Sequence, residues 1–248
     1  MNDDFLPGVS AAHVLARLAK AGGDEIDSGK FANPESSAAL ACNTFGWFVE
    51  RPGDLPPLPG MKPHATASLV DVEYSARFPW RGGRHPWLDA VVETSDQLIG
   101  IESKRFEPYR DRKKPVFSAA YSRPVWGRDM KPYEAMRDAL GSGQLTFDFL
   151  EAAQLVKHAF GLVTDGRRKG KAPVLVYLFA EPASLKGSPI PAASFGRHRE
   201  EIARFAAAVR EAEVSFQAIS YREWVATWPA PPSPVSDHAR AVIERFQP

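Results

Sequence analysis

The chain has only one cysteine, Cys42, among its 248 residues. A single cysteine excludes a disulfide within the chain and a zinc site built from several cysteines, and it is typical of a protein from a reducing compartment. No apolar run approaches the roughly 18 residues that a membrane-spanning helix needs, and the opening MNDDFLPGVS lacks the apolar core of a signal peptide. We therefore expect a cytoplasmic protein that does not associate with a membrane.

The chain also lacks an excess of charge of either sign, since 31 Lys and Arg residues face 30 Asp and Glu residues, for a net charge of +1. This balance excludes a protein that coats nucleic acid with a uniformly basic surface, so any affinity for nucleic acid must come from a local patch. What the chain does have is a hydrophobic content of 44%, which is enough to build a real core.

The stretch from Trp87 to Arg105, WLDAVVETSDQLIGIESKR, has the pattern of two strands joined by a turn. If the hairpin folds symmetrically about Ser95 and Asp96, Asp89 lies opposite Glu102, and Lys104 lies one pleat further along the face of Glu102. Opposed side chains have Cβ atoms only about 4.5 to 5.5 Å apart. Two carboxylates that close repel unless a cation or a proton lies between them, so the spacing predicts a divalent metal site beside a lysine.

The remaining patterns predict a peripheral helix and linker over residues 1–30 and a single domain over residues 31–248. The domain is expected to open with a helix that has Asn33 as its N-cap and Pro34 in its first position. Glu35 would stand in the first turn, where it complements the helix dipole. The other predicted elements are a strand at 67–78, a helix at 146–161, a flexible basic loop at 165–171, a buried strand at 172–182, a helix at 194–212, a strand at 214–220 and short helices at 221–227 and 235–246.

Arginine and lysine alternate with aromatic residues over about 105–145, a segment that we interpret as an insertion in the domain. That mixture suits a phosphate backbone with stacked bases, whereas the alternative is a solvated insertion whose aromatic rings pack inward. The position directly after the acidic hairpin favours nucleic acid. The candidate phosphate contacts here and on later elements are Arg105, Arg110, Arg112, Lys113, Lys114, Lys157, Arg167 and Arg168.

The predicted order is helix, three-strand antiparallel meander, helix, strand, helix, strand, with Asp89 followed after twelve residues by Glu102-Ser103-Lys104. This arrangement resembles the PD-(D/E)XK nuclease superfamily, also called the restriction endonuclease-like fold. The resemblance implies an α/β domain with a mixed central sheet flanked by helices. The proline of the PD signature is absent, since Leu88 precedes Asp89.

The resemblance also implies roles for individual residues. Asp89 and Glu102 would hold Mg²⁺, or Mn²⁺ in its place, with the Ser103 carbonyl as an extra ligand, and Lys104 would position the nucleophile or balance the developing charge. Some branches add a glutamate from the helix before the meander and a glutamine or lysine from the helix after it. Glu35 and Gln154 occupy those two elements, and Gln154 shares a helix face with His158.

We therefore expect a magnesium-dependent nuclease that acts on DNA, and specifically an endonuclease. Whether it forms a homodimer to cut both strands is left open by the sequence. Two alternatives remain. A nuclease-like scaffold would bind nucleic acid or protein without cutting. In the plainest reading, Asp89 and Glu102 are solvated strand charges and Lys104 is their surface partner, an interaction of about 0 to 1 kcal/mol.

Overall fold

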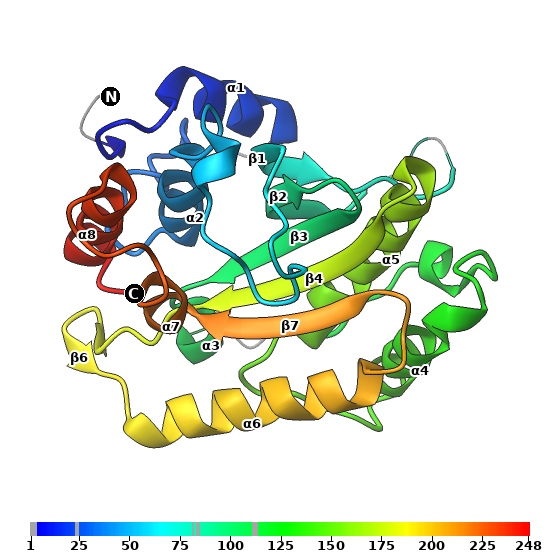
Figure 1. The fold of residues 1–248 in the computed structure, drawn as a ribbon. Coiled ribbons are helices and arrows are strands. Elements are labelled where there is room, and N and C mark those ends of the chain that lie inside the picture. The colour runs from blue at the N-terminus through cyan, green and yellow to red at the C-terminus, as the bar shows by residue number, and fades with distance from the viewer. Residues whose placement is uncertain (1–3, 23–24, 81, 83–84, 111–113) are drawn as a thin grey trace.

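The computed structural model describes residues 4–22, 25–80, 82, 85–110 and 114–248 (Figure 1). Its central sheet contains β1 (Leu69–Ser75), β2 (Trp87–Glu93), β3 (Gln97–Lys104), β4 (Ala172–Phe179) and β7 (Ser215–Ser220). The helices are α1 (Ala11–Ala21), α2 (Ser37–Gly46), α3 (Glu107–Arg110), α4 (Lys131–Gly141), α5 (Ala152–Lys169), α6 (Ala192–Val209), α7 (Tyr221–Val225) and α8 (Pro234–Phe246). Shorter elements are the 3-10 turns η2 (Pro52–Asp54), η3 (Ala119–Ser122) and η4 (Arg128–Met130) and the strand pair β5 (Ser184–Leu185) and β6 (Ser188–Pro189).

The strands lie side by side in the order β1-β2-β3-β4-β7. The first three form an antiparallel meander, while β4 runs parallel to both β3 and β7. Parallel neighbours need a long crossover, and α5 and α6 supply the two crossovers. This mixed sheet flanked by helices confirms the predicted fold class.

Helices cover both faces of the sheet (Figure 1). The α1 and α2 helices pack on β1, and α8 packs against α2, whereas α5 and α6 cover the opposite face together with α4. Ile99 and Ile101 of β3 belong to the core on the α2 side, and Leu98 belongs to the core on the α5 side. Since side chains alternate along a strand, Glu102 and Lys104 face α5 from a strand that is buried along its whole length.

Helix α2 begins later than the sequence predicts. Its N-cap is Ser36, whose side chain accepts a hydrogen bond from the Ala39 amide (3.1 Å), and its first residue is Ser37. Asn33 instead accepts a hydrogen bond from the Glu35 amide (2.8 Å) within the preceding turn. The expected N-cap at Asn33 is wrong, and Glu35 lies outside the helix, because two neighbouring polar residues compete for the same capping role and Ser36 holds it.

Helix α5 begins at Ala152 and continues to Lys169, so the flexible loop predicted at 165–171 is wrong. Asp165 is fully buried within this last part of the helix and accepts hydrogen bonds from the Tyr74 hydroxyl and the Arg77 amide, both at 3.1 Å. The helix ends at Gly170, which has a left-handed φ of 63°. A buried acid with partners on another segment stabilises a helix that the local sequence, with its glycines and basic residues, does not reveal.

The segment predicted as a basic aromatic insertion is partly core. Phe106, Trp126 and Tyr133 are at most 5% exposed, and the Trp126 ring stacks on Phe160 with a centroid separation of 4.3 Å. Base stacking is therefore wrong for these three rings, because apolar burial holds them inside, Trp126 and Tyr133 in the core on the α5 side. None of the helices in the described ranges combines the length and apolar composition of a membrane span.

Candidate active site

The β2–β3 hairpin has the predicted register, with Ala90 paired to Ile101 and Val91 paired to Gly100. Ala90 and Ile101 form the last pair of the ladder on the side away from the turn. Asp89 and Glu102 are the next residues on the two strands. Beyond that point the Ser103 amide donates to Asp89 Oδ2 at 2.6 Å, so a carboxylate takes the place of the missing ladder acceptor. The strands thus open where the two acids stand.

Glu102 lies buried between two nitrogen groups. The residue is 1% exposed, with Lys104 Nζ 2.5 Å from its Oε1 and His158 Nδ1 3.1 Å from its Oε2. Both contacts are within ion-pair distance, yet neither carboxylate oxygen has a partner with hydrogen-bond geometry in the described part of the chain. Glu102 therefore sits in a charged environment that leaves its acceptor capacity incompletely used.

The charges of the hairpin shift its pKa values in opposite directions. Burial raises the pKa of Asp89 well above its usual range, and the nearby Glu102 carboxylate raises it further. Burial acts on Glu102 in the same way, but the Lys104 ammonium and then His158 outweigh it and lower the pKa of Glu102 to about 2. Burial disfavours the Lys104 ammonium, but Glu102 and Asp89 reverse that effect and raise its pKa. The resting site thus stabilises a charged Lys104–Glu102 pair and disfavours the ionised form of Asp89.

Glu73 on β1 is a further acid beside the site that the sequence analysis missed. It has a left-handed φ of 49°, and the alternation of faces shifts there, since Val72 packs in the α2-side core whereas Tyr74 packs against the α5-side core. Burial raises the pKa of Glu73 to about 7, with further contributions from Glu25 and Glu102. No local signal distinguishes this residue from an ordinary strand glutamate.

Helix α5 presents Gln154 and His158 on one face, as their spacing predicts. Gln154 Oε1 is buried without a hydrogen-bond partner in the described ranges, and His158, at 2% exposure, makes the contact with Glu102. Sequence reasoning noted the shared face but gave His158 no role. The spacing of residues 151, 154 and 158 could have indicated this role, because it places all three on one face of the helix.

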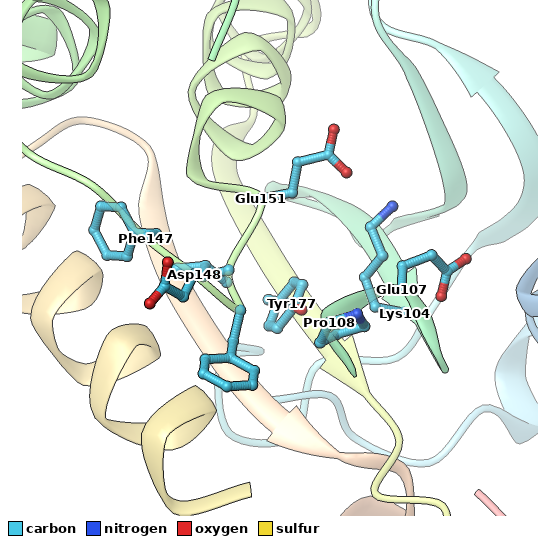
Figure 2. Close-up of a pocket in the computed structure, with 9 residues that line it drawn as sticks. Lys104, Glu107, Pro108, Phe147, Asp148, Glu151 and Tyr177 are labelled. Atoms are coloured by element: carbon cyan, nitrogen blue, oxygen red, sulfur yellow. The ribbon is translucent and has the colours of Figure 1, made fainter. Parts of the chain in front are cut away.

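A hollow next to Lys104 is lined by three acids that the sequence analysis did not single out, Glu107, Asp148 and Glu151, of which Glu107 and Glu151 act on Lys104. Figure 2 shows the side chains of Lys104 and Glu151 extending into the same space, with Tyr177 between their elements. The negative charges of Glu107 and Glu151 contribute to the raised pKa of Lys104. Glu107 also accepts a hydrogen bond from the Ser37 hydroxyl, which ties α3 to the start of α2. The sequence signal for Glu107 is its position only three residues after Lys104.

Glu35 is placed apart from this cluster. Its Oε1 accepts a hydrogen bond from the Lys186 amide at 3.1 Å, and it lines a hollow with Arg105 and Phe246. Its contacts within the described residues do not include Asp89, Glu102 or Lys104. The structure thus brings Asp89, Glu102 and Lys104 together and places Gln154 on α5 one turn before His158, whereas the late start of α2 leaves Glu35 in a turn.

Three of the predicted phosphate-binding arginines already have protein partners. Arg105 is 5% exposed and donates to the carbonyl oxygens of Pro34 and Phe246. Arg167 pairs with Glu213 and also donates to a main-chain carbonyl. Arg168 pairs with Asp165 at 2.6 Å.

The other predicted phosphate contacts are closer to solvent. Lys114 and Arg110 are exposed, and Lys157 is partly exposed with its Nζ 5.5 Å from the centroid of the Phe117 ring. Arg112 and Lys113 lie outside the described residues. Lys114 and Lys157 both line a hollow that also contains Glu151.

The donor set fits a hard cation that keeps part of its water shell. No group of three His, Cys, Asp or Glu residues suited to a metal occurs in the described ranges. Asp89 and Glu102 would therefore be joined by main-chain oxygen and water, an arrangement that Mg²⁺ commonly takes. The Ser103 hydroxyl meets the Tyr221 hydroxyl at 2.7 Å on the opposite side of β3, which leaves only the Ser103 carbonyl as a candidate ligand. In the described residues both Glu102 oxygens already face nitrogen groups, Lys104 and His158, so a cation would share Glu102 with these partners, while Gln154 Oε1 is buried without a hydrogen-bond partner.

Comparison with known proteins connects this geometry to a family. The family model described as Restriction Endonuclease associating with ARP matches residues 5–245. No curated protein and no solved structure matches the chain. The matched region includes the whole central sheet, the acidic hairpin and α5, so a restriction endonuclease-like relationship rests on the entire fold rather than on a short motif.

Proposed function

The chain belongs to the family described as Restriction Endonuclease associating with ARP, and from this premise we propose that it is a magnesium-dependent nuclease that cuts phosphodiester bonds in DNA. The observation that carries the proposal is the open end of the β2–β3 hairpin, where Asp89 and Glu102 lie with Lys104 at 2.5 Å from Glu102. The family description also names an association with ARP. We therefore include in the proposal that the nuclease associates with ARP.

Asp89 and Glu102 would hold the metal, with the Ser103 carbonyl as a third oxygen donor, and Mn²⁺ is the expected substitute. The proposal is supported by the two carboxylates that adjacent strands bring together, since carboxylate oxygens are the ligands that an oxygen-seeking ion takes. When bound, Mg²⁺ lowers the pKa of a bound water and stabilises negative charge on phosphate oxygens.

Lys104 and His158 control the state of Glu102. The Lys104 ammonium keeps Glu102 ionised despite its burial, which is the form that a cation needs. The same ammonium group, in a site shielded from water, is suited to stabilising the negative charge that a phosphodiester develops as it is attacked. His158 holds the other oxygen of Glu102 from α5, and Gln154, one turn earlier, offers a buried carbonyl oxygen on the same side.

Plasmid and oligonucleotide cleavage with Mg²⁺ tests the proposal. We expect wild-type protein to cut DNA, and Asp89→Asn, Glu102→Gln and Lys104→Met each to lower the rate at least about a hundredfold, as removal of charge-stabilising groups does elsewhere. Glu211→Gln and Lys20→Met are the matched controls. Glu211 pairs with its neighbour Arg210 at the surface, and Lys20 lies exposed in the last turn of α1. Both controls should retain wild-type rates.

Calorimetric titration with Mg²⁺ and Mn²⁺ separates the nuclease from a nuclease-like binding module. A nuclease should bind either ion at millimolar concentration, and Asp89→Asn should remove that binding. Equal DNA cleavage by wild type and the three site variants would refute the assignment. Absence of both cleavage and metal binding would favour a module that binds without cutting.

A further inference from the structure

Three hollows follow one another along the first half of α5. The hollow at Lys104 shares Phe147, Leu150 and Glu151 with a second hollow, which contains Lys114. The second shares Val116 and Lys157 with a third. Neighbouring hollows have lining residues in common, so the three lie in series between Lys104 and the segment before β2, and we call this series the path.

The third hollow is aromatic. It has a cavity volume of about 440 Å³, within the range of sites that hold small organic groups, and it is lined by Phe78, Trp80, Val116, Ser118, Ala120, Tyr121 and Lys157. The Phe78 ring lies 4.9 Å from Trp80 and 5.3 Å from Tyr121, centroid to centroid. Phe78 belongs to the core, whereas Trp80 and Tyr121 are only partly buried, so these two rings are the ones that can offer a stacking surface to the cavity.

Cations lie over these rings. The Arg123 guanidinium is 4.3 Å from the Trp80 centroid, and Lys157 Nζ is 5.9 Å from the Tyr121 centroid. No carboxylate lines the third hollow in the described part of the chain, whereas the acids of the path, Glu107, Asp148 and Glu151, all line the hollow at Lys104. The lining therefore changes from acidic groups near Lys104 to basic and aromatic groups, which suit a nucleotide, in the third hollow.

We propose that the third hollow takes an unpaired base of a DNA strand whose phosphates pass Lys157 and Lys114 on the way to Lys104. This inference rests on the proposed nuclease function and names its substrate class, which is DNA with a single-stranded segment such as an overhang or a flap. Aromatic rings and basic side chains together bind single strands because every base has a face to stack and every linkage has a negative charge. A base inside an intact duplex would first have to leave its stack.

Binding measured in EDTA tests the inference without any contribution from cleavage. Fluorescence anisotropy would compare a labelled single strand, a blunt duplex and a duplex with a single-stranded overhang. We expect the first and third to bind about tenfold or more tightly than the second, and Trp80→Ala and Lys157→Ala to remove that preference. Trp80→Phe retains a ring and should keep most of the preference, while Lys20→Ala is the control for a lost surface lysine.

A photochemical readout guards against a variant that simply fails to fold. A single strand carrying 5-iododeoxyuridine should crosslink wild-type protein at Trp80, Phe78 or Tyr121, as mapped by mass spectrometry. Equal affinity for single strands and blunt duplex, or crosslinks confined to other elements, would overturn the inference even if the protein cuts DNA. Absence of binding to any DNA would also overturn it and would favour a protein segment as the occupant. Preferential binding without cleavage would instead contradict only the nuclease assignment.

Discussion

The buried ion pair between Lys104 and Glu102 should contribute a large coupling energy to folding. An ion pair at the surface of this protein has the same nitrogen–oxygen distance and serves as the comparison. Lys104 Nζ lies 2.5 Å from Glu102 Oε1, and the side chains are 11% and 2% exposed. Arg240 Nη2 lies 2.5 Å from Asp237 Oδ1 on α8, with side chains 59% and 68% exposed. The two pairs differ in burial while the separation is the same.

The difference in burial sets the expected magnitudes. At 2.5 Å, Coulomb attraction is about 7 kcal/mol for an effective dielectric constant of 20 and about 1.7 kcal/mol in water. Desolvation cancels part of the larger figure, but removal of one partner leaves the other charge buried and uncompensated, which costs about 3 to 5 kcal/mol. The exposed pair should contribute about 0 to 1 kcal/mol.

Double-mutant cycles measured by urea unfolding in EDTA check these values. Glu102→Gln and Lys104→Met should each lower the free energy of unfolding by about 3 to 5 kcal/mol, and the double variant should recover much of that loss. The matched cycle uses Arg240→Met and Asp237→Asn. A coupling energy for the buried pair as small as that of the surface pair would refute the view that Lys104 and Glu102 form a dry charged site.

Two further outcomes follow from other parts of the fold. Gly100→Ala should lower the free energy of unfolding, measured with urea, by about 1 to 3 kcal/mol. The reason is that the new Cβ would lie 2.7 Å from Leu88 Cδ1 and 2.8 Å from Leu162 Cδ1. Gly141→Ala is the control, because no described atom beyond its chain neighbours and the backbone of its own helix lies within 4 Å of its Cβ. Burial lowers the pKa of His198 from 6.5 to about 3, so the unfolded chain binds more protons between these values and stability falls as the pH falls. Wild type should therefore lose about 3 kcal/mol more than His198→Gln between pH 7 and pH 4, and parallel pH profiles for the two proteins would contradict this reasoning.

The sequence predicted the hairpin because its information is local. Alternating apolar residues and a polar turn specify a two-residue period and a register, and Asp89 and Glu102 follow from that register without knowledge of the rest of the chain. The order of helices and strands around the hairpin was predictable for the same reason. The sheet order and the fold class then agree with the structure.

Capping and helix length were less predictable. Asn33 and Ser36 are both good N-caps, and only the packed structure selects Ser36, which leaves Glu35 in a turn. Asp165 extends α5 through a stretch that resembles a loop, because its partners Tyr74 and Arg77 come from a segment far away in the sequence. In both cases a tertiary contact overrides a local preference.

By itself, the sequence determined the strand register, the face on which Glu102 and Lys104 lie, and the helical stripe of Gln154 and His158. Only the tertiary structure decided that His158 meets Glu102, that Glu73 lies beside the acids, and that Arg105 is buried in main-chain hydrogen bonds rather than exposed. The physical reason is the range of each interaction. Periodicity and turn geometry act between neighbours along the chain, whereas burial, desolvation and charge pairing depend on which elements pack together, and they set the charge state of the candidate site.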